Sequence, residues 1–284
     1  MMTTSRNTLR RLIVALTTIR RIDASTAWCL GLVALSILGW IAYLIVMGDM
    51  DRGQGTVLQD FPTFLSGWVI MLTAMMLPSE ILYVKVYAAL LEGDIEKQQE
   101  QVSRFTCVTY FIAGYGIAWI VYGIVAFILD AVVRESTFDF IAWHRAEPML
   151  AGSVLFLAGI YQVSSLKHAC LTHCRSPLSY FARNWRHGRR GSLRMGLSHG
   201  FVCVGCCWAL MAVMFAVGTM SLIWMGLLTL LMFAEKIFPF GHKLAIPIAA
   251  FLWVMGVWIA VSPESAPLFK DLLLFDHLSH THGL

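Results

Sequence analysis

Apolar residues occur in long runs along the chain, and polar residues are concentrated in the connections between the runs. A helix needs about 20 apolar residues to cross a hydrocarbon core of roughly 30 Å. The pattern predicts an all-α fold, a polytopic bundle of about seven transmembrane helices. The seven runs are Trp28–Met47, Phe64–Leu91, Phe105–Val133, Met149–Leu166, Gly196–Val217, Met220–Ile237 and Leu244–Val261.

Lysine and arginine are distributed unevenly among the connections. The chain has 21 of them, and they are densest in residues 6–21 and 175–194. Positively charged connections stay in the cytoplasm, so we expect a cytoplasmic N-terminus and an outer C-terminus. The predicted organisation is a basic cytoplasmic segment over 1–26, a transmembrane helical domain over 27–262 and an outer tail over 263–284.

The composition supports a membrane protein rather than a soluble enzyme. Hydrophobic residues make up 58% of the chain and charged residues 13%, whereas soluble domains carry roughly 25% charge. We expect a multi-pass protein of the bacterial cytoplasmic membrane. Aromatic residues alternate with arginines over 177–194, and beside a membrane this pattern is more typical of contact with anionic lipid than with nucleic acid. The expected partner is therefore the lipid bilayer.

The cysteines are clustered. Five of the seven lie between Cys170 and Cys207, which is unlike a secreted disulfide framework. Cys203 precedes Cys206 and Cys207 by three and four residues, so the three share one side of a helix. Cys170 and Cys174 have the same four-residue spacing just after the fourth run.

Other polar residues are predicted to meet these cysteines in the inner half of the membrane. They are Glu80 near the end of the second run, Glu235 near the end of the sixth, His168 and His199. Glutamate inside a membrane is costly and usually faces a partner or a cavity. Pro78 is expected to kink the second helix beside them.

The lysine partners of the two glutamates are open at this point. Lys85, Lys167 and Lys236 are all placed near the inner ends of their runs, and each could pair with Glu80 or Glu235. Gly200 and Gly205 permit close approach of another helix to the cysteine-bearing run.

Thiolates and thioethers bind soft metal ions, especially Cu(I) and Zn²⁺. Four cysteines would suit zinc, and two or three with methionine nearby would suit copper better. Because neighbours on a helix are about 100° apart, we rank Cys203 and Cys207 above Cys206. The candidate ligands are Cys170, Cys174, Cys203, Cys206, Cys207, His168, His199, Glu80 and Glu235, supported by Lys167, Lys236, Pro78, Met75 and Met76.

The C-terminal segment contains a second possible metal-binding feature. His277, His280 and His282 lie close together in it, and histidine-rich tracts bind Zn, Cu or Ni. This tail is expected on the outer side, opposite the cysteines. A solvated tail without a role explains it equally well.

Three motifs together resemble a bacterial family of integral membrane proteins that is described as predicted metal-binding and has no established function. They are Met75-Met76-Leu77-Pro78, Lys167-x-x-Cys170-x-x-x-Cys174-Arg175 and Cys203-x-Gly205-Cys206-Cys207-Trp208, with Glu235-Lys236 following. The resemblance implies that metal binding involves the cysteines of these motifs and Glu235, with Lys167 and Lys236 in support.

Three functions are consistent with these features. The favoured one is binding of a soft metal ion, copper before zinc, for delivery, storage or transport, with a membrane metalloenzyme or complex as a possible recipient. A membrane thiol oxidoreductase using Cys206 and Cys207, or Cys170 and Cys174, is an alternative. An accessory structural subunit of a membrane complex is the third. A non-enzymatic role is the more consistent with the pattern.

Overall fold

The computed structural model describes residues 26–45, 61–98, 103–136, 143–217, 222–238 and 241–261. Within these ranges every regular element is a helix, which agrees with the predicted all-α class. The helices are Thr26–Ile45, α2 (Phe61–Met75), α3 (Leu77–Gln98), α4 (Arg104–Ser136), α5 (Trp143–Gln162), α6 (Ser165–Cys174), α7 (Pro177–Asn184), α8 (Gly188–Val217), α9 (Leu222–Ile237) and α10 (Gly241–Val261).

Three stretches are long and apolar enough to cross a membrane as single helices: Thr26–Ile45, Arg104–Leu129 and Gly188–Met214. Two bent helix pairs bring the number of candidate spans to as many as five. α9 and α10 correspond to the last two predicted runs, and the apolar stretch Ala245–Val261 is shorter than a full span. The number of seven spans and their orientation remain predictions.

One bent pair is a single run in the hydrophobic pattern, and the other extends from the run Met149–Leu166 to Cys174. The run Phe64–Leu91 is divided between α2 and α3, which meet at 61°. Pro78 occupies the first turn of α3. A proline is tolerated there because the backbone N–H groups of the first turn have no acceptor within the helix, so the missing N–H of proline costs no hydrogen bond. α5 and α6 meet at 67°. The break between α2 and α3 is enclosed, with Met75 and Met76 buried, whereas Val163 and Leu166 at the break between α5 and α6 are exposed.

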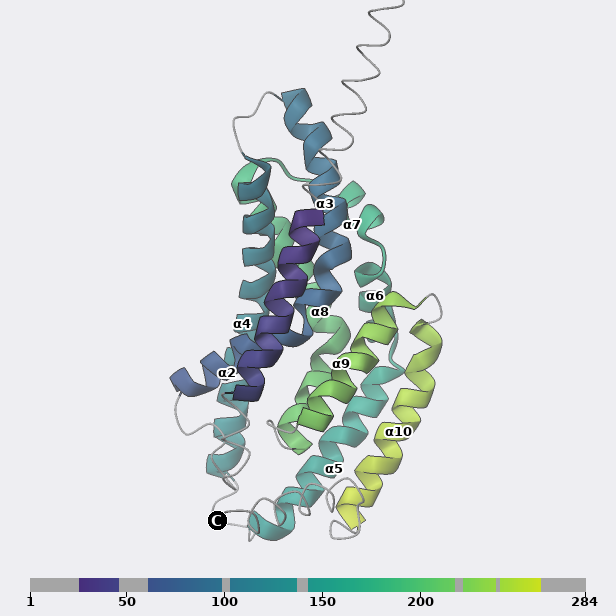
Figure 1. Cartoon of the computed structure of the whole chain (residues 1–284). Coiled ribbons are helices and arrows are strands. Elements are labelled where there is room, and N and C mark those ends of the chain that lie inside the picture. Colours follow the sequence, from purple (N-terminus) through teal and green to yellow (C-terminus); the bar gives the residue numbers. More distant parts are fainter. Residues whose placement is uncertain are drawn as a thin grey trace, which may run out of the picture.

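The helices form an elongated bundle in which α4 and α8 lie side by side, as do α5 and α10 (Figure 1). Glycines permit both contacts. A Cβ at Gly200 of α8 would lie 2.6 Å from the Ala118 Cβ of α4, and one at Gly152 of α5 would lie 2.5 Å from the Gly256 carbonyl oxygen of α10. Small residues of this kind let helix backbones approach closely.

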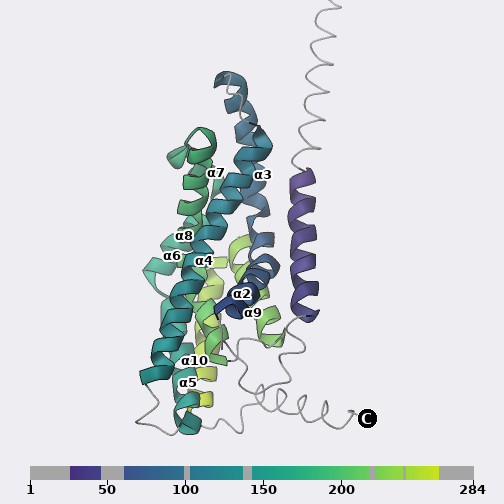
Figure 2. The ribbon, with the colours of Figure 1, turned by 90° about the vertical axis from the view of Figure 1, so that its left-hand side faces the viewer.

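α8 is the central helix, because its contacts with α4, α5, α6 and α9 are together the most extensive of any helix in the described part of the chain. Figure 2, a view at 90° to the first, shows the first helix, Thr26–Ile45, at the edge of the bundle. The cysteines of α8 are buried, as are its neighbours Ala209, Leu210 and Met211. The helix that carries the predicted chemistry is thus the one most enclosed by the others.

The arginine-rich connection folds as α7 and the first turns of α8. Tyr180 and Phe181 of α7 are buried against Tyr83 and Tyr87 of α3, and the arginines are exposed. Burial raises the pKa of the Tyr180 phenol above its usual value. Its neutral hydroxyl donates a 2.6 Å hydrogen bond to a backbone carbonyl of α8.

Two of the predicted segments lie outside the described residues. These are most of the basic segment over 1–26 and the tail over 263–284, which contains His277, His280 and His282. The proposed division of the chain and the outer histidine site therefore stay predictions.

Candidate metal centre

Three cysteine sulfurs from two helices meet inside the bundle. The Sγ atoms of Cys174, Cys203 and Cys206 all lie within 4.8 Å of one another, and all three residues are buried. The Sγ atoms of Cys174 and Cys206 are 3.6 Å apart. We call these three residues the cysteine cluster. Its sulfurs are close enough to bind a single ion.

Local features of α6 and α8 bring the three sulfurs together. Cys203 and Cys206 are one helical turn apart on α8, as their spacing predicts. α6 begins after Ser164, whose side chain accepts a hydrogen bond from the Lys167 backbone N–H at 3.2 Å. Its buried side consists of Lys167, Leu171 and Cys174. The change of direction after α5 therefore presents the last residue of α6 to α8.

The arrangement of Cys206 and Cys207 differs from the expected one. Cys206 belongs to the cysteine cluster, and Cys207 Sγ lies 3.6 Å from Cys206 Sγ but outside the group of three. The Cys207 thiol donates to the Cys203 backbone carbonyl at 2.9 Å. Helical rotation separates the Cα–Cβ directions of neighbours, but side-chain rotation still brings both sulfurs to one side. The order in which Cys206 and Cys207 would bind a metal ion therefore stays a prediction, and the geometry of the free site favours Cys206.

Cys170 occupies a different place from Cys174. It is half-buried where α6 crosses α8, and a Cβ added at Gly205 would lie 2.8 Å from its Sγ. Gly205 thus allows the close approach predicted for it, and the helix it admits is α6. Cys170 borders the cysteine cluster without belonging to it.

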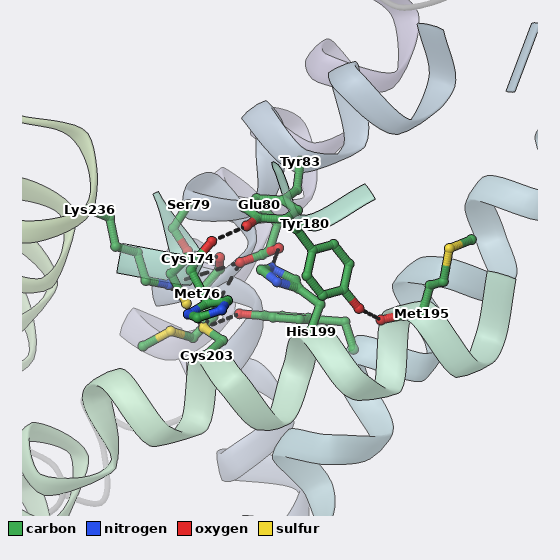
Figure 3. A network of polar contacts seen from close by, with 12 residues as sticks. Met76, Ser79, Glu80, Tyr83, Cys174, Tyr180, Met195, His199, Cys203 and Lys236 are labelled. Carbon is green, nitrogen blue, oxygen red and sulfur yellow. Dashed lines mark hydrogen bonds and ion pairs between the residues drawn. The ribbon is translucent and has the colours of Figure 1, made fainter. Parts of the chain in front are cut away.

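Lys236 supplies a positive charge directly at the cysteine cluster. Its ammonium donates to the Cys203 Sγ at 3.0 Å and to the Ser79 Oγ at 2.8 Å. Figure 3 shows Lys236 reaching toward both of these residues. The nearest oxygen of Glu80 is 4.0 Å from the ammonium. A thiolate at Cys203 would therefore have a cation in contact with it, which a buried anion requires.

Glu80 and His199 form the other side of this network. A ring nitrogen of His199, Nε2, lies 2.7 Å from Glu80 Oε2. The imidazole stacks on the Tyr83 ring with centroids 3.8 Å apart. Glu80 Oε1 is 4.0 Å from Cys203 Sγ, so both residues predicted as ligands lie beside the cysteine cluster. In this geometry Glu80 pairs with Nε2 of His199, and the role of the two residues as metal ligands stays a prediction.

Glu235 has a separate set of partners. The Lys167 ammonium lies 2.7 Å from one of its oxygens, and the Gln162 amide donates to the other. Lys167 also donates to the Gln162 Oε1 at 2.5 Å. All three side chains are buried. Glu235 is thus held at the break between α5 and α6, and its carboxylate is not among the grouped ligand atoms.

His168 is exposed on α6, away from the buried side that carries Cys174. The structure therefore does not bring this predicted ligand to the cysteine cluster.

Met75 and Met76 are buried in the same packed core as the cysteines, and Met76 is drawn with the polar network in Figure 3. They remain candidates for a supporting role.

Sequence reasoning missed three residues that contact the predicted ones. The Tyr115 hydroxyl lies 3.3 Å from Cys203 Sγ, Ser79 accepts from Lys236, and Gln162 bridges Lys167 and Glu235. Gln162 carried a detectable signal, because it is an uncharged amide inside a predicted span. Tyr115 and Ser79 resemble many other polar residues of membrane helices and gave no such signal.

The fold and the cysteine cluster define an all-helical protein with a buried group of thiols suited to a soft metal ion. A family model described as "PpoB2: Copper chaperone" matches residues 65–259. The chain therefore belongs to this copper chaperone family. The matched range contains every residue of the cysteine cluster and both lysine networks. No curated protein and no solved structure matches the chain.

Proposed function

We propose that this protein binds Cu(I) through Cys174, Cys203 and Cys206 inside the membrane and delivers, stores or transports it. The observation that carries the proposal is the convergence of three buried sulfurs within 4.8 Å. Membership of a copper chaperone family supports copper as the cargo. A membrane metalloenzyme or complex would be a recipient of the ion.

The number and kind of ligands favour copper over zinc. Structural zinc sites in proteins have four ligands, and the group found among the described residues has three. Thiolates with thioethers nearby select Cu(I), and buried methionines surround the cysteines. Zinc would need Cys207 or another group as a fourth ligand.

The charge of the surroundings supports binding of a cation by thiolates. Three thiolates and one Cu(I) together carry a net charge of −2, which is costly to bury. Lys236 offsets part of this charge through its contact with Cys203. Glu80, the nearest carboxylate, is held by His199, so its charge is directed toward the histidine rather than toward the sulfurs.

The proposal includes a location for the site. In the seven-span topology with a cytoplasmic N-terminus, α8 enters from the cytoplasm. At 1.5 Å per residue, Cys203 would then lie about 10 Å and Cys207 about 16 Å beyond Gly196. The site would lie in the inner half of the bacterial cytoplasmic membrane, within reach of a cytoplasmic donor or acceptor.

A thiol oxidoreductase is the second candidate, because two pairs of sulfurs are 3.6 Å apart, Cys174 with Cys206 and Cys206 with Cys207. Counting of alkylated thiols after oxidation and after reduction separates the two functions. An oxidoreductase must cycle between two and zero free thiols in one of these pairs. Thiols that keep the same count under both conditions contradict it.

The copper-binding proposal is tested by loading the purified full chain with Cu(I) under anaerobic conditions. Wild type should bind copper stoichiometrically. Cys206→Ser should lower the affinity at least about 100-fold, equivalent to about 2.7 kcal/mol, because it removes one of three ligands. Cys207→Ser should change it far less. Cys29→Ser, in a half-buried cysteine of the first helix, is the matched control.

The result that contradicts copper binding is a wild-type protein without stoichiometric copper after this loading. If Cys206→Ser and Cys207→Ser both leave copper content unchanged, the cysteines serve packing. That outcome would favour the structural-subunit hypothesis.

A further inference from the structure

Methionines gather in the same packed core as the cysteine cluster. On α8, Met211 and Met214 follow Cys203 and Cys207 along one side of the helix, at spacings of four, four and three residues. On α9, Met225 and Met232 are seven residues apart on its buried side. Such spacings keep side chains on one face of a helix. Two soft-ligand stripes therefore run along neighbouring helices.

The short connection between Val217 of α8 and Leu222 of α9, together with the contact between Lys236 and Cys203, sets the register of these stripes. α8 and α9 are consecutive helices in contact, and the Lys236 ammonium is 3.0 Å from the Cys203 sulfur. Both helices advance 1.5 Å per residue. The two helices run in opposite directions. Cys207, four residues after Cys203 on α8, is therefore level with Met232, four residues before Lys236 on α9.

Seven further residues along each helix bring Met214 level with Met225. This level is about 16 Å from Cys203 along the helix axis. Met211 lies one turn before Met214 on the same side of α8. By this register the three methionines lie at neighbouring levels of α8 and α9, between the cysteine cluster and the ends of the two helices that are adjacent in sequence.

All three methionines are enclosed. Met211 and Met225 are fully buried and Met214 is 2% exposed. Their packed core contains apolar residues such as Leu210, Val213 and Leu228 alongside them. Three thioethers form a neutral, soft ligand set. Such a set accepts Cu(I) or Ag(I) and disfavours harder divalent ions.

We propose that Met211, Met214 and Met225 form a second binding site for a soft monovalent cation, weaker than the cysteine cluster. The inference rests on the proposed function, since it gives the copper of the cysteine cluster a place to go to or come from. Cys207 and Met232, level with each other, lie between the two sites. Figure 1 shows α7 and the start of α8 at the upper end of the bundle and the start of α9 lower down.

The site explains why Met, rather than Leu, occupies these positions. Both residues fill a core of this kind, and Met is the more adaptable. Only Met carries a donor atom for Cu(I). A thioether needs no deprotonation to bind, whereas thiolate binding competes with protons. The two sites therefore differ in their response to pH.

The test uses the purified full chain, titrated anaerobically with Cu(I) and, in parallel, with Ag(I). We expect two bound ions in wild type, the second weaker. The triple variant Met211→Leu, Met214→Leu and Met225→Leu should lose the second ion and keep the first. Met195→Leu, a change in a buried methionine of α8 that belongs to the other packed core, is the matched control and should keep both.

A second variant separates this inference from the proposed function. Cys174→Ser with Cys206→Ser should lose the tighter ion and keep the weaker one, whose binding should persist when the pH is lowered. If this variant binds no ion at all, or if the methionine triple binds as wild type does, the methionine site is overturned. A third outcome is that wild type binds a single ion and the triple methionine variant binds none. In that case the methionine site stands and the proposal for the cysteine cluster fails.

The single variant Met225→Leu guards against a triple variant that does not fold. It should weaken binding of the second ion without changing the helical circular dichroism or the affinity of the first. An unchanged second affinity in this folded variant counts against the proposal.

Discussion

Two buried lysines of this protein lie near glutamates and are used in different ways. The Lys167 ammonium is 2.7 Å from a Glu235 carboxylate oxygen, and Gln162 contacts both. The Lys236 ammonium is 4.0 Å from the nearest oxygen of Glu80. It contacts a sulfur and a hydroxyl more closely.

The difference identifies which lysine lies at the cysteine cluster. Lys167 and Glu235 satisfy each other within a closed network, as a structural ion pair does. Lys236 contacts the Cys203 sulfur at 3.0 Å while Glu80 pairs with His199. Lys236 lies closer to the Cys203 sulfur than to the Glu80 carboxylate. We therefore expect the negative charge that it balances to be on the Cys203 sulfur. The first network should therefore govern stability and the second copper affinity.

The largest effect is expected from Lys167→Met. This change leaves the Glu235 carboxylate buried without its cation, and breaking a buried ion pair in this way costs about 3–5 kcal/mol. Copper affinity of the protein that remains folded should stay close to wild type. The measurement is unfolding of the detergent-solubilised protein followed by circular dichroism.

The double variant Lys167→Met with Glu235→Leu is the control for this prediction. It removes both charges, so it should be more stable than the single variant. A single variant as stable as wild type would show that the pair does not hold α6 to α9.

A smaller effect, on copper rather than on stability, is expected from Lys236→Met. The copper-loaded site carries more negative charge than the free site, so the ammonium stabilises the loaded form more. Its removal should weaken Cu(I) binding about tenfold, or about 1.4 kcal/mol. Competition with a chromophoric Cu(I) chelator measures the change.

Lys236→Arg keeps the charge and should restore most of the affinity. Copper binding by Lys236→Met that equals or exceeds wild type would remove the distinction between the two lysines.

The smallest effect is expected from Ser79→Ala. Ser79 accepts from Lys236 and donates to the Met76 carbonyl at the break between α2 and α3. Loss of such a hydrogen bond costs about 1 kcal/mol, and only part of it should appear as weaker copper binding by the same competition assay. Ser66→Ala, in an exposed serine of α2 with a local hydrogen bond, is the control. Equal affinities in these two variants would mean that Ser79 does not position Lys236.

Much of the helical fold was predicted from the long apolar runs of the sequence. The long apolar runs predict helices because helix formation depends on local spacing and on the need to satisfy backbone groups within each segment. Pro78 correctly indicated the bend between α2 and α3. The bend between α5 and α6 had no proline to mark it, and the polar residues Gln162, Ser164 and Ser165 at this position were not interpreted as a break.

The cysteine cluster was predicted in part. The spacing of Cys203 and Cys206 placed them on one side of α8, but the ranking favoured Cys207. That ranking considered the direction of each Cα–Cβ bond and not the rotation of the side chain. Which of Cys170 and Cys174 would meet α8 depended on the 67° change of direction before α6, which the hydrophobic pattern did not predict.

The sequence by itself determined a helical fold with long apolar helices and a stripe of cysteines on one helix, because both depend on residues close together along the chain. The tertiary structure decided that Cys174 completes the cysteine cluster and that Lys236, not Lys167, contacts it. The physical reason is that these contacts join residues dozens of positions apart. They depend on how two broken helices are directed, and a buried charge takes whichever partner that packing brings within reach.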